Sequence, residues 1–201
     1  QEESLLSFME QDAVYKKYRD EVIILLGTGL RISEFCGLTT ALDFKNRQIN
    51  VDHQLLRDTD IGYYVETPKT KNGTRQIPMS EDVYQALRRV LKNRSNAAPF
   101  SVEGYKNFLF LKNDGMPKVA ANYESMLKGL VKKYNKQNRE QLPNITPHIL
   151  RHTFCTRLAN AGMNPKALQY IMGHANITMT LNYYAHATYD SAKAEMERLA
   201  A

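Results

Sequence analysis

The amino-acid sequence predicts an α+β fold that is mostly helical, with one small antiparallel sheet about a third of the way along the chain. Apolar residues recur at helical spacing near both ends of the sequence. Thr-Pro and Asn-Pro pairs mark two helix starts, and an Asn-Gly pair separates two β-rich runs. The 201 residues contain no repeat or linker, so we expect residues 1–201 to form a single domain.

Two helices are expected near the N-terminus. Four apolar residues repeat at helical spacing until a glycine-rich turn ends the pattern: Val14, Tyr18, Val22 and Leu25, then Gly27-Thr28-Gly29. The glycines allow a tight turn into a second, short helix, which we expect over residues 32–37.

The middle of the sequence is expected to supply the sheet. Short β-rich runs cover residues 48–51, 63–67, 75–79 and 105–111. Because Asn72-Gly73 stands between the second and third runs, we expect those two runs to pair through a two-residue hairpin.

The remaining elements are expected to be helices with clear start signals. Ser80 precedes two acidic residues, a pattern typical of an N-cap and a first turn that complements the helix dipole. The helix expected over 120–134 carries a basic face at Lys128, Lys132 and Lys133. The later helices are expected from Thr146-Pro147 to about residue 161, from Asn164-Pro165 to Gly173, over 180–186 and over 190–199.

Composition excludes several classes of protein. Two cysteines, Cys36 and Cys155, are too few for a disulfide scaffold or a cysteine-based zinc site. No apolar run reaches the roughly 18 residues that a membrane span needs, and the N-terminus has no secretory signal pattern. We therefore expect a cytoplasmic protein with no membrane partner, and the missing initiator Met suggests a piece of a longer protein.

The net charge of +6 is unevenly distributed. Residues 63–140 carry a net charge of +8, whereas residues 1–62 carry −4 and residues 141–201 carry +2. A regional basic surplus indicates an anionic partner, most commonly nucleic acid, and the alternative is a solvated basic face without a partner.

One helix start is a candidate anion site. The expected N-cap places His148 in the first helical turn and Arg151 one turn later, so both could hold a phosphate with the first-turn amides. His148 and His152 also have the spacing of zinc-binding helices, but Ile149 stands where those helices carry a glutamate. A basic helix end that faces solvent is the remaining alternative.

Three other groups could carry chemistry. Arg31 lies near a helix start with Glu34 one turn later, and the alternative is a weak surface ion pair. A basic hairpin tip could enter a DNA groove or merely favour solubility. A histidine follows a glycine, and two adjacent tyrosines point about 100° apart on a helix, where core packing is the alternative. The hairpin tip consists of Lys69, Lys71 and Arg75. The histidine is His174, and the adjacent tyrosines are Tyr183 and Tyr184.

The order of these groups resembles the tyrosine recombinase (phage-type integrase) family over nearly the whole chain. The order is Arg-x-x-Glu, a lysine hairpin, His-x-x-Arg, Gly-His and Tyr-x-His. The phrases Thr-Pro-His…Arg-His-Thr and Thr-Leu-Asn…Tyr-x-His are most similar to integrases of conjugative transposons. The resemblance implies the tyrosine recombinase catalytic domain fold.

The resemblance also implies a role for each candidate residue. Tyr184 would be the nucleophile because it begins Tyr-Ala-His, and Tyr183 is the alternative because both spacings from His174 occur among relatives. Lys71 would be the general acid, with Lys69 as the alternative. The other catalytic residues would be Arg31, His148, Arg151 and His174, with Glu34 in support, and DNA would be bound by Lys69, Arg75, Lys128 and Lys132.

The implied activity is site-specific cleavage and rejoining of DNA strands through a 3′-phosphotyrosine intermediate, which integrates and excises a mobile element. A tyrosine with a pKa of about 10 is only about 0.1% ionised at pH 7, so it needs a base or nearby cations. Preorganised arginines stabilise the charge that develops on a phosphate, so no metal, ATP or other cofactor is expected.

The resemblance further implies partners and a larger assembly. The expected partners are double-stranded DNA, further copies in a tetramer on DNA, and an excisionase or a host DNA-bending protein in the bacterial cytoplasm. Residues 188–201 would form a tail helix that docks on a neighbouring copy or on its own domain, and core-binding and arm-binding domains are expected to be absent from this chain. The alternatives are a type IB-like topoisomerase, an Xer-type chromosome dimer resolvase and a DNA-binding protein without catalysis.

Overall fold

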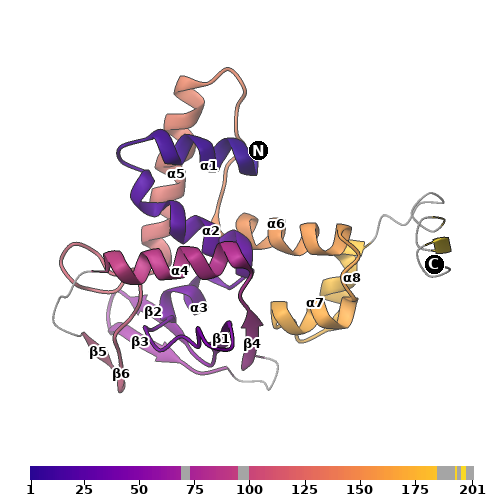
Figure 1. Ribbon diagram of the computed structural model, residues 1–201. Helices are drawn as coiled ribbons and strands as arrows, with labels where there is room; N and C mark the ends of the chain where they lie inside the picture. The colour runs from indigo at the N-terminus through magenta and orange to yellow at the C-terminus, as the bar shows by residue number, and fades with distance from the viewer. Residues whose placement is uncertain (69–72, 95–99, 185–192, 194–195, 198–201) are drawn as a thin grey trace.

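Helices make up most of the structure, and pairs of short strands lie along one edge (Figure 1). The computed structural model describes residues 1–68, 73–94, 100–184, 193, 196 and 197. The helices are α1 (Glu2–Gln11), η1 (Lys16–Tyr18), α2 (Arg19–Thr28), α3 (Ile32–Gly37), α4 (Glu81–Asn93), α5 (Ala120–Gln137), α6 (Pro147–Asn160), α7 (Pro165–Met172), α8 (Ile177–Leu181) and η2 (Asn182–Tyr184). The strands are β1 (Gln48–Val51), β2 (Gln54–Asp58), β3 (Gly62–Glu66), β4 (Arg75–Pro78), β5 (Ser101–Val102) and β6 (Tyr105–Lys106).

Helix α2 lies at the centre of the core. It contacts α1, η1, α4 and α6, and its buried residues, among them Val22, Ile24 and Leu25, lie on several of its sides. A helix that is apolar all round is stable only when other elements cover it on every side. The predicted helix over 14–25 therefore exists, but it begins at Arg19, and Val14 is exposed in the preceding loop.

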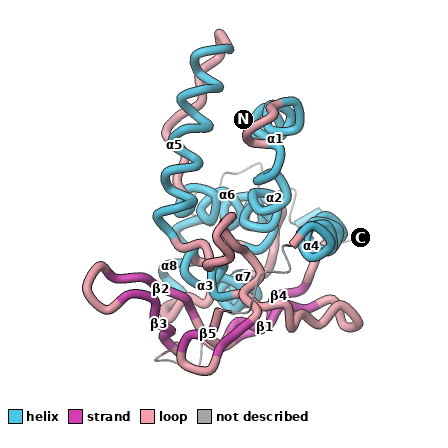
Figure 2. Tube along the Cα trace, turned by 90° about the vertical axis from the view of Figure 1, so that its left-hand side faces the viewer, coloured by secondary structure: helices cyan, strands magenta, loops and turns pink. Residues whose placement is uncertain are grey.

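The prediction of a hairpin between the 63–67 and 75–79 runs is wrong. β3 pairs antiparallel with β2, with Leu55 opposite Val65, whereas β4 pairs antiparallel with β1, with Ile49 opposite Ile77. The described strands therefore form separate two-stranded pairs rather than one sheet. In Figure 2 the β2–β3 pair projects from the body of the molecule.

A turn upstream of Asn-Gly fixes the partner of β3. The Asp58 carboxylate accepts hydrogen bonds from the backbone N–H groups of Asp60 and Ile61, at 2.8 and 3.4 Å. Gly62 then adopts a φ of 81°, a left-handed conformation that glycine adopts at little cost. This closed turn joins β2 to β3 before the chain reaches Asn72, and residues 69–72 lie outside the described part of the chain.

The predicted N-caps are confirmed. The side chains of Ser80, Thr146 and Asn164 each accept hydrogen bonds from backbone N–H groups in the first turn of α4, α6 and α7. These caps satisfy amides that a helix leaves without partners, and they fix where α6 and α7 begin. The start of α6 matters most, because it carries His148 and Arg151.

Glycines in the left-handed conformation end two helices, as the sequence indicates. Gly29 follows α2 and Gly173 follows α7, each with a φ of 62°. A Cβ atom at Gly29 would lie 2.3 Å from a ring carbon of Phe154, so a side chain there would force α2 and α6 apart. The two turns direct their carbonyl groups toward the same region of the molecule, which is described below.

Other boundaries differ modestly from the predictions. The strand expected over 105–111 is a strand only at Tyr105–Lys106, with isolated bridges at Phe108 and Leu111, and α5 extends to Gln137. The helix expected over 180–186 appears as α8 followed by the 3-10 turn η2 within the described residues. Most of the helix expected over 190–199 lies outside the described residues, and α1 was not predicted.

Candidate active site

Arg31 is positioned by the start of α3. It is the residue before the helix, and its backbone N–H donates to the Glu34 carboxylate at 2.9 Å, while its guanidinium donates to the same carboxylate at 2.8 Å. A second guanidinium nitrogen donates to the Gly173 carbonyl at 3.0 Å. The Arg31 side chain is 41% exposed, so it is held in place and can still reach a ligand.

Arg151 reaches the same region from α6. Its side chain is buried, and its two terminal nitrogens donate to the carbonyls of Gly29 and Met172. Burial, followed by the charge of Arg31, lowers the pKa of Arg151 to about 10, which leaves it charged at neutral pH. The carbonyls belong to the C-terminal ends of α2 and α7, where the helix dipole favours a cation.

Arg75 does not lie at an exposed hairpin tip, where it was expected to bind DNA. Its side chain is fully buried rather than exposed at a hairpin tip, and it forms a two-pronged ion pair with Glu34 at 2.9 Å for each nitrogen–oxygen contact. Burial alone would raise the pKa of Glu34, but hydrogen bonds and charge from Arg75, with a smaller effect of Arg31, lower it. Glu34 is therefore the carboxylate that balances these cations.

His174 lies directly after Gly173 and is buried. Its Nδ1 atom is 2.9 Å from the hydroxyl of Thr180, which orients the ring. Burial, and then the charges of Arg151, Arg31 and Arg75, lower the pKa of His174 to about 4. The ring is therefore neutral at pH 7 and can offer one N–H group to a neighbouring oxygen.

This pKa predicts an acid-sensitive contribution to stability. Between the unfolded pKa of about 6.5 and the folded pKa, the unfolded chain binds the proton more strongly, so the free energy of unfolding falls as the pH falls. From pH 7 to pH 4 we expect the free energy of unfolding to fall by up to about 3 kcal/mol through His174. A His174→Gln variant should not show this decrease. Urea unfolding of both proteins at several pH values measures the difference. If the free energy of unfolding changed with pH equally in both proteins, the lowered pKa of His174 would be contradicted.

His148 is exposed in the first turn of α6, one turn before the buried Arg151. The confirmed N-cap therefore places the two residues one turn apart on α6, as the sequence predicted, with His148 at the surface. Such a position leaves its ring accessible to a ligand and to solvent.

The two tyrosines take different positions in η2. The Tyr183 ring lies close to the site: its centroid is 4.9 Å from that of His152 and 6.5 Å from that of His174. The Tyr184 hydroxyl instead donates to the Met163 carbonyl at 2.5 Å. Burial raises the pKa of both phenols, although the charge of Arg151 acts to lower that of Tyr183. In this structure Tyr183, not Tyr184, faces the histidines.

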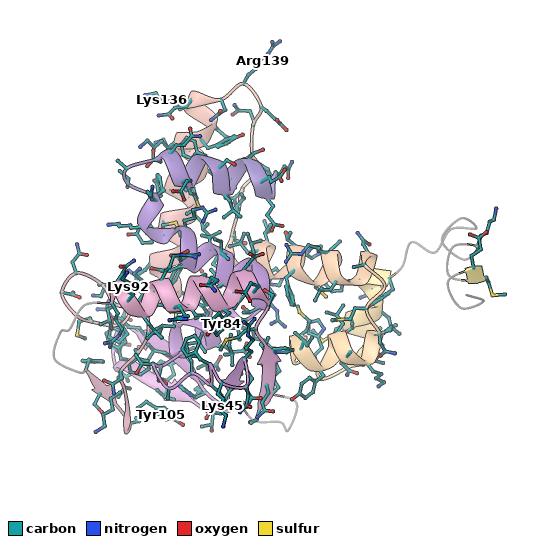
Figure 3. All side chains as sticks on the ribbon, viewed as in Figure 1. Lys45, Tyr84, Lys92, Tyr105, Lys136 and Arg139 are labelled. Atoms are coloured by element: carbon teal, nitrogen blue, oxygen red, sulfur yellow. The ribbon has the colours of Figure 1, made fainter. Side chains whose placement is uncertain are left out.

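The remaining predicted residues are four lysines, two outside the described residues and two on α5. Lys69 and Lys71 lie outside the described residues. Lys128 and Lys132 are exposed on α5, beside Lys133, which pairs with Asp12 at 2.5 Å. Figure 3 shows Lys136 and Arg139 at the far tip of this helix region, so the basic residues of α5 extend away from α7 and α8.

The arrangement as a whole has the charge and the donors of a candidate anion site. The guanidinium groups of Arg31 and Arg75 bind one carboxylate, that of Glu34, while Arg151 is held by carbonyls and the neighbouring His174 is neutral. Backbone carbonyls at the ends of α2 and α7 accept hydrogen bonds from Arg31 and Arg151 and so stabilise the excess positive charge. A tetrahedral anion with several oxygens is the ligand that such planar, forked donors bind best.

Sequence reasoning missed the groups that hold the arginines. The carbonyls of Gly29, Ile171, Met172 and Gly173 accept from the three guanidinium groups. The glycine-ended helices were visible in the sequence, but which side chain reaches each carbonyl depends on contacts between residues 21 to 142 positions apart.

The described part of the chain has neither a cluster of metal-binding side chains nor a membrane-spanning helix. No group of three or more His, Cys, Asp or Glu side chains there could hold a metal ion. No helix among the described residues is long and apolar enough to cross a membrane.

Arginines, histidines and a tyrosine ring in one part of the structure form a cluster whose charge and forked donors suit a phosphate group. The chain belongs to the phage integrase family, whose model matches residues 1–191. This result confirms the resemblance that the sequence motifs indicated.

The relatives include transposon transposases and tyrosine recombinases. The chain is 68% identical over 200 residues to the transposase from transposon Tn916 of Enterococcus faecalis, across 99% of this chain and 49% of the relative. It is 30% identical over 172 residues to tyrosine recombinase XerC of Bacillus subtilis, across 85% of this chain and 50% of the relative. The chain thus spans about half the length of these curated relatives.

Solved structures confirm the fold. The chain matches the Tn1549 transposon integrase in complex with a circular intermediate DNA, with a TM-score of 0.93 and 67% identity over 99% of this chain and 64% of that one. It matches the XerA recombinase with a TM-score of 0.67 and 25% identity over 98% of this chain and 62% of that one. The predicted α+β, mostly helical recombinase catalytic fold is therefore correct.

Proposed function

We propose that this chain is the catalytic domain of a bacterial site-specific recombinase that integrates and excises a mobile element. The observation that carries the proposal is the convergence of Arg31, Arg151 and His174 beside the ring of Tyr183, the neighbour of Tyr184. The 68% identity to a transposon transposase favours a mobile element over the chromosomal role of the more distant Xer relatives. The DNA to be cut lies in the bacterial cytoplasm.

The proposed reaction exchanges one phosphodiester for another. The oxygen of Tyr184 attacks the phosphorus, its proton passes to His148, and the bond to the 5′-oxygen breaks. Lys71 protonates that oxygen, which leaves a 3′-phosphotyrosine and a free 5′-hydroxyl. Attack by a 5′-hydroxyl from another strand reverses these steps and releases the tyrosine, so neither ATP nor a metal is consumed.

Charge stabilisation by the arginines is the main contribution of the site. Two terminal nitrogens of Arg151 donate to carbonyls, and those of Arg31 donate to Glu34 and Gly173. A guanidinium has five N–H donors, so each arginine retains donors for the phosphate among the contacts of the described residues. Because the arginines are already oriented, little reorganisation opposes the transition state.

The proposed nucleophile must move before it can react. The Tyr184 hydroxyl donates to the Met163 carbonyl. Tyr184 lies in the 3-10 turn η2, directly before residues outside the described part of the chain. We infer that DNA binding rotates η2 and exchanges this hydrogen bond for a position in line with the phosphate.

Cleavage of a suicide substrate tests the proposal. The chain is incubated with a labelled duplex that carries the joined ends of the element and a nick near the cleavage site, and covalent protein–DNA product is measured on a denaturing gel. We expect a product that protease converts to a short peptide on the 3′ end. Absence of such a product would overturn the proposal. Relaxation of supercoiled plasmid without strand exchange between two sites would favour a topoisomerase instead.

A Lys71→Ala variant should cleave the normal substrate more slowly by about 10²-fold or more, because the leaving 5′-oxygen then lacks its proton donor. A 5′-phosphorothiolate substrate has a leaving group that needs no proton, so it should restore the rate. The comparison is made in single-turnover cleavage assays with both substrates. Rescue of a Lys69→Ala variant, and not of Lys71→Ala, would assign the general acid to Lys69.

The proposed assembly extends beyond one chain. We propose that copies form a tetramer on double-stranded DNA and that residues 188–201 dock on a neighbouring copy, with an excisionase or a DNA-bending protein assisting excision. Lys128 and Lys132 are exposed on α5 and are proposed to bind the DNA backbone. Their replacement by Ala should weaken DNA binding most at low salt.

A further inference from the structure

A single buried side chain joins the elements that carry the proposed catalytic groups. Arg75 is the first residue of β4, and its side chain is 0% exposed. Its Nη1 and Nη2 atoms each donate to one oxygen of Glu34, at 2.9 Å. Its Nε atom donates to the Ile171 carbonyl at 2.7 Å, and Nη1 also donates to the Gly73 carbonyl at 3.2 Å. All these contacts come from one rigid, planar group.

The contact with Glu34 leads directly to Arg31. The two Glu34 oxygens that bind Arg75 also accept from the guanidinium and from the backbone N–H of Arg31. Glu34 is therefore fixed from both sides. If Arg75 no longer held it, the carboxylate could rotate, and the orientation of Arg31 toward a phosphate would change with it.

The contact with Ile171 leads to His174. Ile171 is in the last turn of α7, Gly173 ends that helix, and His174 follows. A Cβ atom on Gly173 would lie 2.8 Å from Nη1 of Arg75, so the guanidinium packs directly beneath this turn. The Gly73 carbonyl adds a third connection, because residue 73 lies two positions after Lys71 in the sequence.

We propose that Arg75 is a positioning residue for DNA cleavage, which orients Arg31 through Glu34 and holds the turn that carries His174 against the same phosphate. The inference rests on the proposed recombinase function. Stability alone is a weak reason for such a pair, because well-packed apolar residues often replace a buried ion pair without loss. Only a guanidinium can serve both carboxylate oxygens and a carbonyl at once.

The diagnostic variant is Arg75→Lys, which keeps the charge and loses the forked geometry. We expect it to bind the suicide substrate normally and to form the covalent product about 10- to 100-fold more slowly, as is typical when a supporting hydrogen bond is lost. Arg89→Lys is the matched control. Arg89 pairs with Asp20 on the surface at 2.7 Å, and its replacement should leave the rate unchanged.

A double variant separates positioning from general damage to the fold. If Arg75 acts through Arg31, adding Arg75→Lys to an Arg31→Ala chain should lower the rate little further. A loss of folded protein would instead multiply the rate deficit equally in both backgrounds, which would overturn the proposal. An unchanged rate for Arg75→Lys alone would overturn it as well.

A neutral substrate gives a chemical readout of the same point. A methylphosphonate at the scissile position removes one negative charge, so it depends less on a correctly oriented Arg31. The ratio of the cleavage rates of the unaltered chain and Arg75→Lys should be smaller on this substrate than on the normal one. An equal ratio on both substrates would show that Arg75 does not act through the charge clamp.

Two further arms complete the experiment. If Arg75→Lys fails to fold, the neutral pair Glu34→Gln with Arg75→Met replaces it; a folded protein with slow cleavage supports the proposal, and one with normal cleavage overturns it. The unaltered chain is assayed in parallel. No covalent product from the unaltered chain would overturn the recombinase function itself, whereas a normal product with unaffected Arg75 variants would overturn only the inference about Arg75.

Discussion

A Tyr184→Phe variant should bind its DNA substrate as the unaltered chain does and form no covalent protein–DNA product. The substitution removes one oxygen, and without that oxygen no bond to phosphorus can form. The expected loss exceeds the range of a single-turnover assay, about 10⁴-fold or more. Binding is measured by gel shift and the covalent product on a denaturing gel, with the same nicked duplex in both assays.

A Tyr183→Phe variant is the matched control. Its hydroxyl is removed from the ring that lies beside His152 and His174, so the aromatic packing is retained. We expect this variant to keep most of the cleavage activity. If Tyr183→Phe abolishes the product and Tyr184→Phe retains it, the nucleophile is Tyr183, and the contact of Tyr184 with Met163 is only structural.

The position of Tyr184 adds a second expectation to the same experiment. Its hydroxyl donates to the Met163 carbonyl, and Tyr184→Phe removes that hydrogen bond. A part-buried neutral hydrogen bond contributes about 0.5–1.5 kcal/mol, so the variant should be slightly less stable without DNA. A large loss of stability would instead indicate that the turn η2 depends on this contact to fold.

Local signals in the sequence predicted the helix starts well. Ser80, Thr146 and Asn164 cap the helices that follow them, because a cap needs only the first turn of its own helix. The same locality placed His148 and Arg151 one turn apart. The resemblance to the family rested on short sequence motifs in a fixed order, which can be recognised without knowledge of long-range contacts. The family could therefore be predicted from the sequence alone.

Strand partners and side-chain directions depend on contacts that are distant in sequence. Asn72-Gly73 favoured a hairpin, but β4 pairs with β1, because β3 is already joined to β2 by the turn at Asp58 and Gly62. The prediction that Arg75 is exposed at a hairpin tip depended on the predicted hairpin. In the structure Arg75 lies in β4 opposite Val51, and its side chain is buried. A buried charge of this kind has no signature in composition.

An Arg151→Lys variant should lose cleavage activity by about 10³-fold or more while still binding DNA. Arg151 is buried and bridges the carbonyls of Gly29 and Met172. A lysine ammonium is a point charge that cannot span two carbonyls and a phosphate in one plane. Removal of a single preorganised donor already lowers such rates by about 10²- to 10³-fold. The rate of covalent product formation on the suicide substrate measures the effect.

Arg157→Lys is a close control for this prediction, because it changes the same residue type on the same helix. Arg157 also donates to a carbonyl near the end of α2, that of Leu26, at 2.8 Å, but it pairs with Glu2 and is not among the residues of the anion site. If carbonyl contacts at the end of α2 serve only to pack α6, both variants should show the same modest effect. If the helix ends hold Arg151 in place for a phosphate, only Arg151→Lys should abolish cleavage. Equal effects would therefore place the catalytic clamp elsewhere, and a difference of about two orders of magnitude or more would locate it at the carboxyl ends of α2 and α7.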